Sequence, residues 1–357
     1  MDDKLKIAVL VNCDFGTLLI RANYLHCLCE YLSDENVQIT VFGNRSQYMN
    51  DAVFRGQPWF YACYPEDAWE SFKVGGYDLR FILDIYPNIQ GYNKKKARSS
   101  RKLKALVEAW QGLKKDPDNN MYFHRLRESK PYVYTKMINR NQTVLNSADI
   151  GDILRIGTDF RMPILTDRDL ENTLDKFGLV GKKFITLHWE INPMLNITDS
   201  PKLWPVSHYE ELIRLIHQKY DDIVFVQLGE SEEHSKKLNG IDVSLLGKTD
   251  WDDLKILLKE AILHVDGESG MVHLRKALHA GPSVVLFGPT PMEFFGYEGN
   301  INLKSSGCVH WCAELRDDWE YRCIRGETKA SCMYDLHPEY VFQEIQRYLN
   351  GEGSILG

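Results

Sequence analysis

Small polar, acidic and glycine residues gather in two short loops in the second half of the chain. One loop is Glu268-Ser269-Gly270, with His273 close behind it, and the other is Gly288-Pro289-Thr290. A short apolar run precedes each loop, and residues 271–278 between them place apolar side chains at helical spacing. This order predicts a strand, a loop, a helix, a second strand and a second loop, which is a βαβ unit.

Both loops are expected at the edge of the sheet where such units bind ligands. At that edge, helix N-termini present unpaired backbone N–H groups and a partial positive charge. Two tight turns and a capped helix would use the same residue types. The pairing of the loops on adjacent strands, with His273 one turn into the helix, favours a binding site.

The segment resembles that of the glycosyltransferase family 9 heptosyltransferases, whose C-terminal domain carries D-[ST]-G-x-x-H-L-x-x-A-L, then a strand and G-P-T. Here residues 268–278 read E-S-G-M-V-H-L-R-K-A-L, and Gly288-Pro289-Thr290 follows the next apolar run. Glu268 stands where the family has the Asp that binds sugar hydroxyls. The longer carboxylate keeps sugar binding as the expectation and leaves the identity of the sugar open.

The resemblance implies a donor site for a nucleotide sugar. Glu268 would bind sugar hydroxyls, and the diphosphate and its surroundings would be bound by Ser269, Gly270, His273, Gly288, Pro289 and Thr290. Lys202 opens a K-L-W-P sequence similar to the family's K-x-W-P, whose Lys meets the donor phosphates; a purely structural lysine before a helix start is the alternative. Glu230 is placed like the family acid that hydrogen-bonds the ribose, and Glu232 or Glu233 could serve instead.

Apolar runs and helical patterns alternate through both halves of the 357-residue chain, which is long enough for two α/β domains of roughly 150 to 180 residues. We expect the GT-B fold, in which two Rossmann-like domains face a central cleft. Residues 1–165 would form the acceptor side, and residues 166–349 the nucleotide-sugar domain, with a Cys-rich segment at 308–332. A dehydrogenase would share the fold class, but no G-x-G-x-x-G follows any expected strand.

The expected strands and helices follow from the spacing of apolar residues, which differs between strands and helices. Helix starts with capping-box spacing are expected at Ser207 and, more weakly, at Thr249. The strands are expected at residues 7–11, 37–42, 79–85, 184–187, 223–228, 261–265 and 283–287, and the helices at about 17–32, 207–218, 250–260 and 271–278.

The charge of the chain argues against nucleic acid as a partner. Its net charge is −7, whereas nucleic-acid binding usually shows as a basic domain. Residues 94–104 form a basic cluster that leads into an amphipathic helix; this is either a solvated helix face or a surface that meets an anionic acceptor or a membrane. The acidic start and the short apolar run at 7–11 resemble no targeting signal, so we expect a cytoplasmic protein.

The expected catalytic base departs from the family. Heptosyltransferases carry G-D in the first βα loop, and its Asp deprotonates the acceptor hydroxyl, whereas this chain has Gly16-Thr17. A Thr hydroxyl does not ionise near neutral pH and cannot be a general base. Asp14 in the same loop is the first substitute and Asp84, after a later strand, is the second. A base role that has been lost or moved elsewhere is the third interpretation.

Four cysteines cluster in the second half as C-x3-C-x10-C-x8-C, and in a cytosolic protein such a quartet favours a structural zinc or iron site. Reduced, partly buried thiols are the alternative, and His310 or His337 could replace a ligand. The resemblance adds iron as a candidate, because the related protein heptosyltransferases that modify autotransporters hold iron in a Cys-rich segment. The cysteines are Cys308, Cys312, Cys323 and Cys332.

The sequence therefore predicts an inverting glycosyltransferase that moves a sugar from a nucleotide diphosphate, with ADP-heptose as the first candidate, to a hydroxyl of a lipopolysaccharide core, a capsular glycan or a protein. Asp116-Pro117-Asp118 fits a metal-binding D-x-D motif but reads as a turn, so transfer is expected to need no divalent ion at the phosphates. The alternatives are a nucleotide-sugar epimerase, which needs no acceptor, and a non-catalytic nucleotide-sugar-binding protein.

Overall fold

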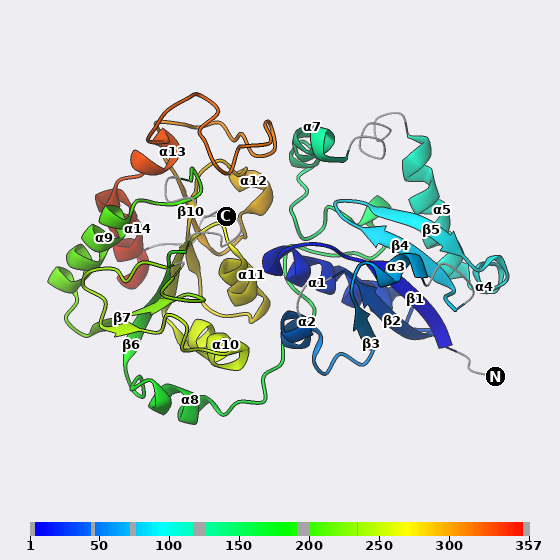
Figure 1. The fold of residues 1–357 in the computed structure, drawn as a ribbon, viewed down its shortest axis with the longest axis horizontal. Helices are drawn as coiled ribbons and strands as arrows, with labels where there is room; N and C mark the ends of the chain where they lie inside the picture. Colours follow the sequence, from blue (N-terminus) through cyan, green and yellow to red (C-terminus); the bar gives the residue numbers. More distant parts are fainter. Residues whose placement is uncertain are drawn as a thin grey trace. The chain divides into compact units, whose positions relative to one another are not determined.

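In a computed structural model of the protein, the described residues are 4–43, 47–71, 76–116, 126–190, 200–233 and 235–352. The chain divides into two units, Met1–Leu165 and Thr166–Gly357, and each is built around its own sheet (Figure 1).

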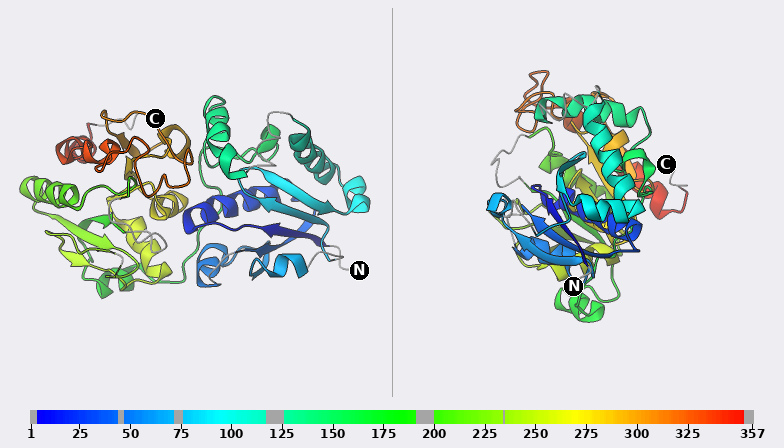
Figure 2. Two further views of the ribbon diagram at one scale, coloured as in Figure 1. Left: turned by 45° about the horizontal axis from the view of Figure 1, so that its top comes forward. Right: turned by 90° about the vertical axis from the view of Figure 1, so that its right-hand side faces the viewer.

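The first unit has a five-stranded sheet in the order β3-β2-β1-β4-β5. Its strands are β1 (Lys4–Leu10), β2 (Asn36–Phe42), β3 (Phe60–Tyr64), β4 (Leu79–Leu83) and β5 (Pro87–Tyr92). Four of them are parallel, while β5 runs antiparallel to β4 at the edge. The two further views in Figure 2 show β1, in dark blue, within this sheet.

Strands β1, β2 and β4 confirm the sequence prediction, whereas β3 and β5 were not predicted. The segment of β5 contains Pro87, Asn88 and Gly91, which weaken a strand signal and are tolerated at a sheet edge. The helices of this unit are α1 (Phe15–Tyr31), α2 (Gln47–Phe54), α3 (Ala68–Ser71), α4 (Lys94–Ser99), α5 (Arg101–Lys115) and α7 (Leu126–Ile138), with a 3₁₀ turn at Ile150–Asp152.

The second unit has a six-stranded, fully parallel sheet in the order β11-β10-β9-β6-β7-β8. Its strands are β6 (Lys183–His188), β7 (Ile223–Leu228), β8 (Val243–Ser244), β9 (Leu263–Gly267), β10 (Ser283–Phe287) and β11 (Ile301–Lys304). Its helices are α8 (Leu170–Lys176), α9 (Val206–Lys219), α10 (Trp251–Glu260), α11 (Gly270–Ala277), α12 (Met292–Phe295), α13 (Ser331–Tyr334) and α14 (Pro338–Leu349).

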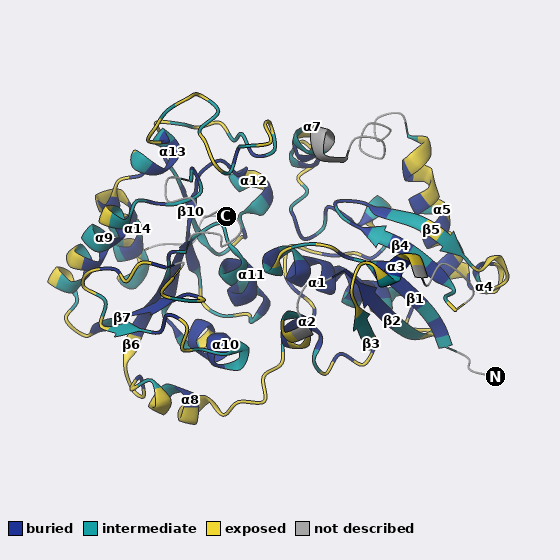
Figure 3. Cartoon of the chain, viewed as in Figure 1, coloured by how far each residue is buried: buried dark blue, intermediate teal, exposed yellow. Residues whose placement is uncertain are grey.

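Helices cover both faces of this second sheet, α9 and α14 on one and α10 and α11 on the other (Figure 1). Strands β6, β7, β9 and β10 are mostly buried and α8 is largely exposed, as the colours in Figure 3 show. The predicted strands and helices of this half are confirmed. The predicted caps are not: Pro205 precedes α9 without a side-chain cap, and α10 has a capping box made by Asp250 and Asp253, one residue further along than the predicted Thr249 pair.

A buried arginine ties α10 to the strand that follows α11. Arg275 on α11 is 1% exposed and donates hydrogen bonds to the carbonyl oxygens of Leu258, Ala261 and Gly281, the last two at 2.9 Å. Carbonyls at a helix C-terminus lack partners within the helix, and the negative end of the helix dipole favours a cation there. Burial lowers the pKa of Arg275 to about 10, so the guanidinium remains protonated at neutral pH.

Replacing this guanidinium should destabilise the second unit. Arg275→Met leaves several buried carbonyls without donors, at about 1–3 kcal/mol each, so we expect the free energy of unfolding in urea to fall by about 3 kcal/mol or more. Arg347→Met is the control, because Arg347 is 60% exposed and pairs only with Glu344 among the contacts described. This variant should lower the free energy of unfolding by less than about 1 kcal/mol. Equal small losses would contradict the anchoring role.

Candidate functional site

The two loops predicted to carry chemistry lie at the same edge of the second sheet. β9 and β10 pair in parallel with Val265 opposite Val284, so Glu268 and Gly288 follow neighbouring strand ends. Ser269 is the N-cap of α11, and its hydroxyl accepts the backbone N–H of Met271 at 3.2 Å. The edge therefore presents the N-terminus of α11, as the sequence predicts.

The segment before α9 packs directly against these loops, and two glycines make room for it. A Cβ atom at Gly288 would lie 2.5 Å from the carbonyl oxygen of Pro201, and one at Gly267 would lie 3.3 Å from that of Lys202. Real side chains do not approach backbone as closely as the first distance. Glycine at position 288 therefore allows the Lys202 segment to approach the loop edge this closely.

Lys202 and the residues of the first loop form a charged cluster. The Lys202 ammonium lies 3.8 Å from the Glu268 carboxylate, which also accepts from Nε2 of His273 at 3.2 Å. The other ring nitrogen of His273 bonds the hydroxyl of Tyr297 at 2.6 Å. Burial alone would raise the pKa of Glu268, but the Lys202 charge and the His273 hydrogen bond bring it below its usual value, so the carboxylate is ionised.

Two residues that the sequence analysis did not identify complete the surroundings of Lys202. Its ammonium lies 3.7 Å from the Glu320 carboxylate and 5.5 Å from the centre of the Trp319 ring. The Lys202 side chain is 32% exposed, so an anionic ligand can reach it. Trp319 and Glu320 lie more than 115 positions along the chain from Lys202, and no spacing rule would have linked them.

A hydrogen-bonded network lies beneath the first loop. Asp266, at the end of β9, accepts from Nδ1 of His188 at 2.9 Å, from the Ser269 hydroxyl and from Nε2 of His264 at 3.4 Å. Thr186 on β6 bonds the other nitrogen of His264 at 3.0 Å. Burial lowers the pKa of His264, so this imidazole is neutral and its Nε2 carries the hydrogen that faces Asp266.

The network continues to the loop after β7. His188 Nε2 donates to Glu190 at 3.1 Å, and both oxygens of Glu190 accept the backbone N–H of Glu230, at 3.0 and 3.2 Å. Glu230 itself is exposed at this edge. The sequence analysis missed His188, Glu190 and Asp266, although a polar H-W-E directly after an apolar run was a signal that could have found the first two.

In the first unit, both candidates for the catalytic base follow neighbouring parallel strands, β1 and β4. Asp14 is the N-cap of α1, and its carboxylate accepts the backbone N–H of Thr17 at 2.9 Å. Asp84 is 40% exposed and lies 3.9 Å from the guanidinium of Arg21, a buried residue of α1. Burial and the nearby acids raise the pKa of the Cys13 thiol to about 12, which keeps this thiol protonated.

Comparison with known proteins decides the family. Residues 105–317, more than half of the chain, match the model described as Glycosyltransferase family 9 (heptosyltransferase). The chain belongs to glycosyltransferase family 9. This family 9 chain is 31% identical over 220 residues to Lipopolysaccharide heptosyltransferase 2 of Escherichia coli K12, a match covering 55% of the chain and 58% of that protein. The chain thus spans little more than half the length of that curated relative.

Solved structures show that the family 9 chain has the GT-B fold. A glycosyl transferase family 9 protein from Veillonella parvula matches with a TM-score of 0.61 and 13% identity over 98% of both chains. The iron-containing heptosyltransferase TibC of enterotoxigenic E. coli matches with a TM-score of 0.61 and 14% identity over 99% of this chain and 78% of that chain. The relatives are transferases, so they favour neither the epimerase nor the non-catalytic alternative.

The Cys-rich segment of this family 9 chain packs on the second loop. The backbone N–H groups of Cys312 and Ala313 donate to the carbonyl oxygen of Pro289 at 2.8 and 3.0 Å. The sulfur of Cys332 lies 3.9 Å from the carbonyl oxygen of Pro201. Burial raises the pKa of Cys332 to about 12, and the proximity of the other three cysteines adds to the rise. Among the described residues, however, no group of three or more His, Cys, Asp or Glu side chains has an arrangement that could hold a metal ion.

Two further sequence features belong to the first unit, whereas the loops belong to the second. Asp116, the first residue of the D-x-D motif, follows α5 as its C-cap, while Pro117 and Asp118 lie outside the described residues. In the basic cluster, Lys96 and Lys102 pair with Asp78 and Asp34. Within the part of the chain that the structure describes, no helix has the length and apolar character needed to cross a membrane.

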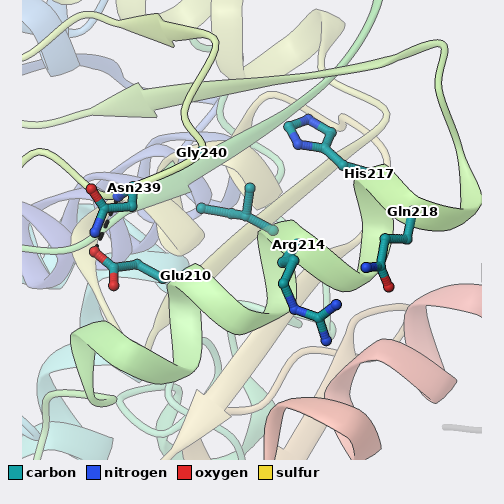
Figure 4. A pocket seen from close by; sticks show the side chains of 7 residues that line it. Glu210, Arg214, His217, Gln218, Asn239 and Gly240 are labelled. Atoms are coloured by element: carbon teal, nitrogen blue, oxygen red, sulfur yellow. Dashed lines mark hydrogen bonds between the residues drawn. The ribbon is translucent and has the colours of Figure 1, made fainter.

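A surface hollow beside α9 contains none of the predicted site residues (Figure 4). It is lined by α9 side chains from Glu210 to Gln218 and by the Asn239-Gly240 turn, whose Asn239 N–H donates to Glu210 at 3.1 Å. The candidate site is the loop edge of the second sheet, where Lys202, Glu268 and the N-terminus of α11 lie together.

Proposed function

We propose that the protein transfers a sugar from a nucleotide diphosphate, with ADP-heptose as the first candidate, to a hydroxyl of a glycan or protein acceptor. One observation carries this: Lys202, Glu268 and the N-terminus of α11 lie together at the carboxyl edge of the second sheet. The named relative, a lipopolysaccharide heptosyltransferase, supports heptose, and TibC was solved in complex with ADP-D-beta-D-heptose.

The charges at this edge suit the parts of such a donor. A diphosphate binds well at a helix N-terminus, and the Lys202 ammonium adds a point charge to the helix dipole. The ionised Glu268 carboxylate is an acceptor for sugar hydroxyls. The Gly288-Pro289-Thr290 loop would meet the charge that develops on the leaving diphosphate, without a divalent ion. Glu230, exposed after β7, would bind the ribose.

Removing the Glu268 carboxylate should separate sugar binding from nucleotide binding. Glu268→Ala is expected to weaken ADP-heptose binding about 10- to 100-fold, since hydrogen bonds to a charged group contribute about 1.5–3 kcal/mol, and to leave ADP binding nearly unchanged. Calorimetric titration with both ligands measures this. Glu320→Ala is the matched control, because it removes the other acid near Lys202 and should not distinguish the two ligands. Unchanged ADP-heptose binding in Glu268→Ala would contradict the proposal that Glu268 binds the sugar.

We place the general base at Asp84. Its carboxylate would take the proton of the acceptor hydroxyl while that oxygen bonds to the anomeric carbon, and the bond from this carbon to the diphosphate breaks, releasing ADP. Asp84 is partly exposed and its contact with Arg21 is long, so an acceptor can reach it. The carboxylate of Asp14 is already committed to capping α1.

Two asparagine variants distinguish the candidates. Asp84→Asn should lower kcat for ADP release, measured with ADP-heptose and a lipopolysaccharide core oligosaccharide or a polypeptide acceptor, by about 10²- to 10⁴-fold. Asp14→Asn should leave kcat within a few fold and also keep the helix cap, because Asn caps helices as well as Asp. The reverse pattern would place the base at Asp14 instead.

We also propose that Cys308, Cys312, Cys323 and Cys332 hold a structural zinc or iron ion. Four thiolates are a donor set that suits either metal, and the four cysteines are near enough to affect one another's charge. When bound, the metal would lock the segment that packs against Pro289 and Pro201. The similarity to TibC, described as iron-containing, makes iron the first candidate.

Metal analysis of the purified protein tests this site. We expect about one equivalent of zinc or iron by plasma mass spectrometry, and its loss in Cys312→Ser together with a lower melting temperature, because metal binding contributes to local folding. Cys27→Ser, which alters a buried cysteine of the first unit, should retain the metal. Metal-free wild-type protein with the same melting temperature after incubation with either metal would contradict the proposal.

A further inference from the structure

One imidazole joins two carboxylates at the carboxyl ends of different strands. His188, at the end of β6, donates through Nδ1 to Asp266 and through Nε2 to Glu190, at 2.9 and 3.1 Å. Ionised carboxylates only accept hydrogen bonds, so both ring nitrogens carry hydrogens and the ring is an imidazolium. All three side chains are nearly buried, with 15% of His188, 6% of Asp266 and 10% of Glu190 exposed.

Each carboxylate holds a different part of the loop edge of the second sheet. Asp266 accepts the hydroxyl of Ser269, the residue that caps α11. Glu190 accepts the backbone N–H of Glu230 with both oxygens. The loops after β6, β7 and β9 are thus linked in a single chain of hydrogen bonds, and His188 is its centre.

We propose that His188 is a positioning residue for the donor nucleotide: by joining Asp266 to Glu190, it sets the spacing between the N-terminus of α11 and the Glu230 loop. This rests on the proposed function, in which the N-terminus of α11 binds the diphosphate and the Glu230 loop binds the ribose. His188 acts through its two carboxylates, and no contact with the donor is assigned to it.

Stability alone does not explain why charged groups are present here. Buried ion pairs are often replaceable by apolar residues without loss of stability, whereas breaking one partner leaves an unpaired charge. A network that fixes the geometry of a binding site gives a reason for charge in this position. The effect of His188 should therefore appear in ligand binding as well as in folding.

The pH range in which the network is intact follows from the groups that face His188. Burial alone would lower its pKa, but Asp266 and Glu190 raise it to about 10. On the elements packed against it, burial raises the pKa of Tyr209 far above its usual value and lowers that of His264. Neither of these two groups changes charge between pH 7 and 10, so His188 is the group in this network that loses its charge as the pH rises toward 10.

The stabilisation from the His188 charge has a definite sign. Because its pKa is raised on folding, the contribution is present in full below the unfolded value of about 6.5 and is lost as the pH rises toward 10. The difference in melting temperature between wild type and His188→Gln should be largest near pH 6 and should shrink toward pH 10.

The decisive experiment compares His188→Gln with Tyr209→Phe. Tyr209 donates its hydroxyl to the backbone carbonyl of His188 at 3.2 Å, so its removal disturbs the same buried region without breaking the chain through the ring. ADP is the probe, titrated by calorimetry at a temperature where every variant is folded. We expect the dissociation constant to rise about 10-fold or more in His188→Gln, since small displacements in a binding site are costly, and to stay within about 2-fold in Tyr209→Phe.

Amide hydrogen exchange tests the link without any ligand. In His188→Gln, peptides containing Glu230 and Met271 should lose protection together, whereas in Tyr209→Phe both should remain protected. Glu190→Gln keeps an oxygen for the Glu230 N–H but removes the charge, so it should fall between wild type and His188→Gln in ADP affinity.

The outcomes separate this inference from the proposed function. If wild type binds ADP and His188→Gln binds it equally well, His188 is not a positioning residue and the inference is overturned. If the peptide containing Glu230 or the one containing Met271 keeps its wild-type protection in His188→Gln, the link itself is refuted. If wild type does not bind ADP while the coupled exchange is seen, the proposed donor fails and the link between the loops stands.

Discussion

The Asp266 carboxylate is the point on which the loop edge of the second sheet depends. A charge buried this deeply is unfavourable unless hydrogen bonds and opposite charge compensate it. His188, His264 and Ser269 supply that compensation from β6, β9 and the start of α11. The same hydrogen bonds that keep Asp266 ionised therefore also hold the helix N-terminus at a fixed place relative to the neighbouring strands.

A steric constraint at Gly288 acts beside this electrostatic one. Because no Cβ is present, the Pro201 carbonyl can approach the loop after β10, and Lys202 follows it to the edge. Its ammonium is then held between Glu268 and Glu320. The result is a positive group and the positive end of a helix beside carboxylates, which matches a ligand that combines phosphates with hydroxyls better than a purely anionic or purely neutral one.

How far the sequence predicts this site depends on the distance along the chain between its parts. The βαβ unit from β9 to β10 was predictable, because its regularly spaced apolar residues, its glycines and its loop residues all lie within about 30 positions. The pairing of His188 with Asp266 was not, since 78 positions separate them and the contact arises only because β6 and β9 are neighbours in the sheet. The cap at Asp250 was displaced by one residue for a local reason: several polar residues there can cap, and backbone geometry selects among them.

The first unit shows how a change in a family motif can be compatible with the same chemistry. Thr17 cannot replace an Asp as a base, but β1 and β4 are adjacent and parallel, so the loops after both strands open at the same edge of the sheet. A carboxylate after β4 is therefore near the place that a carboxylate after β1 would occupy. Asp84 follows β4, and Arg21, one turn along α1 from Thr17, lies beside it. The sheet topology thus lets the base come from a different strand while the edge at which it acts stays the same.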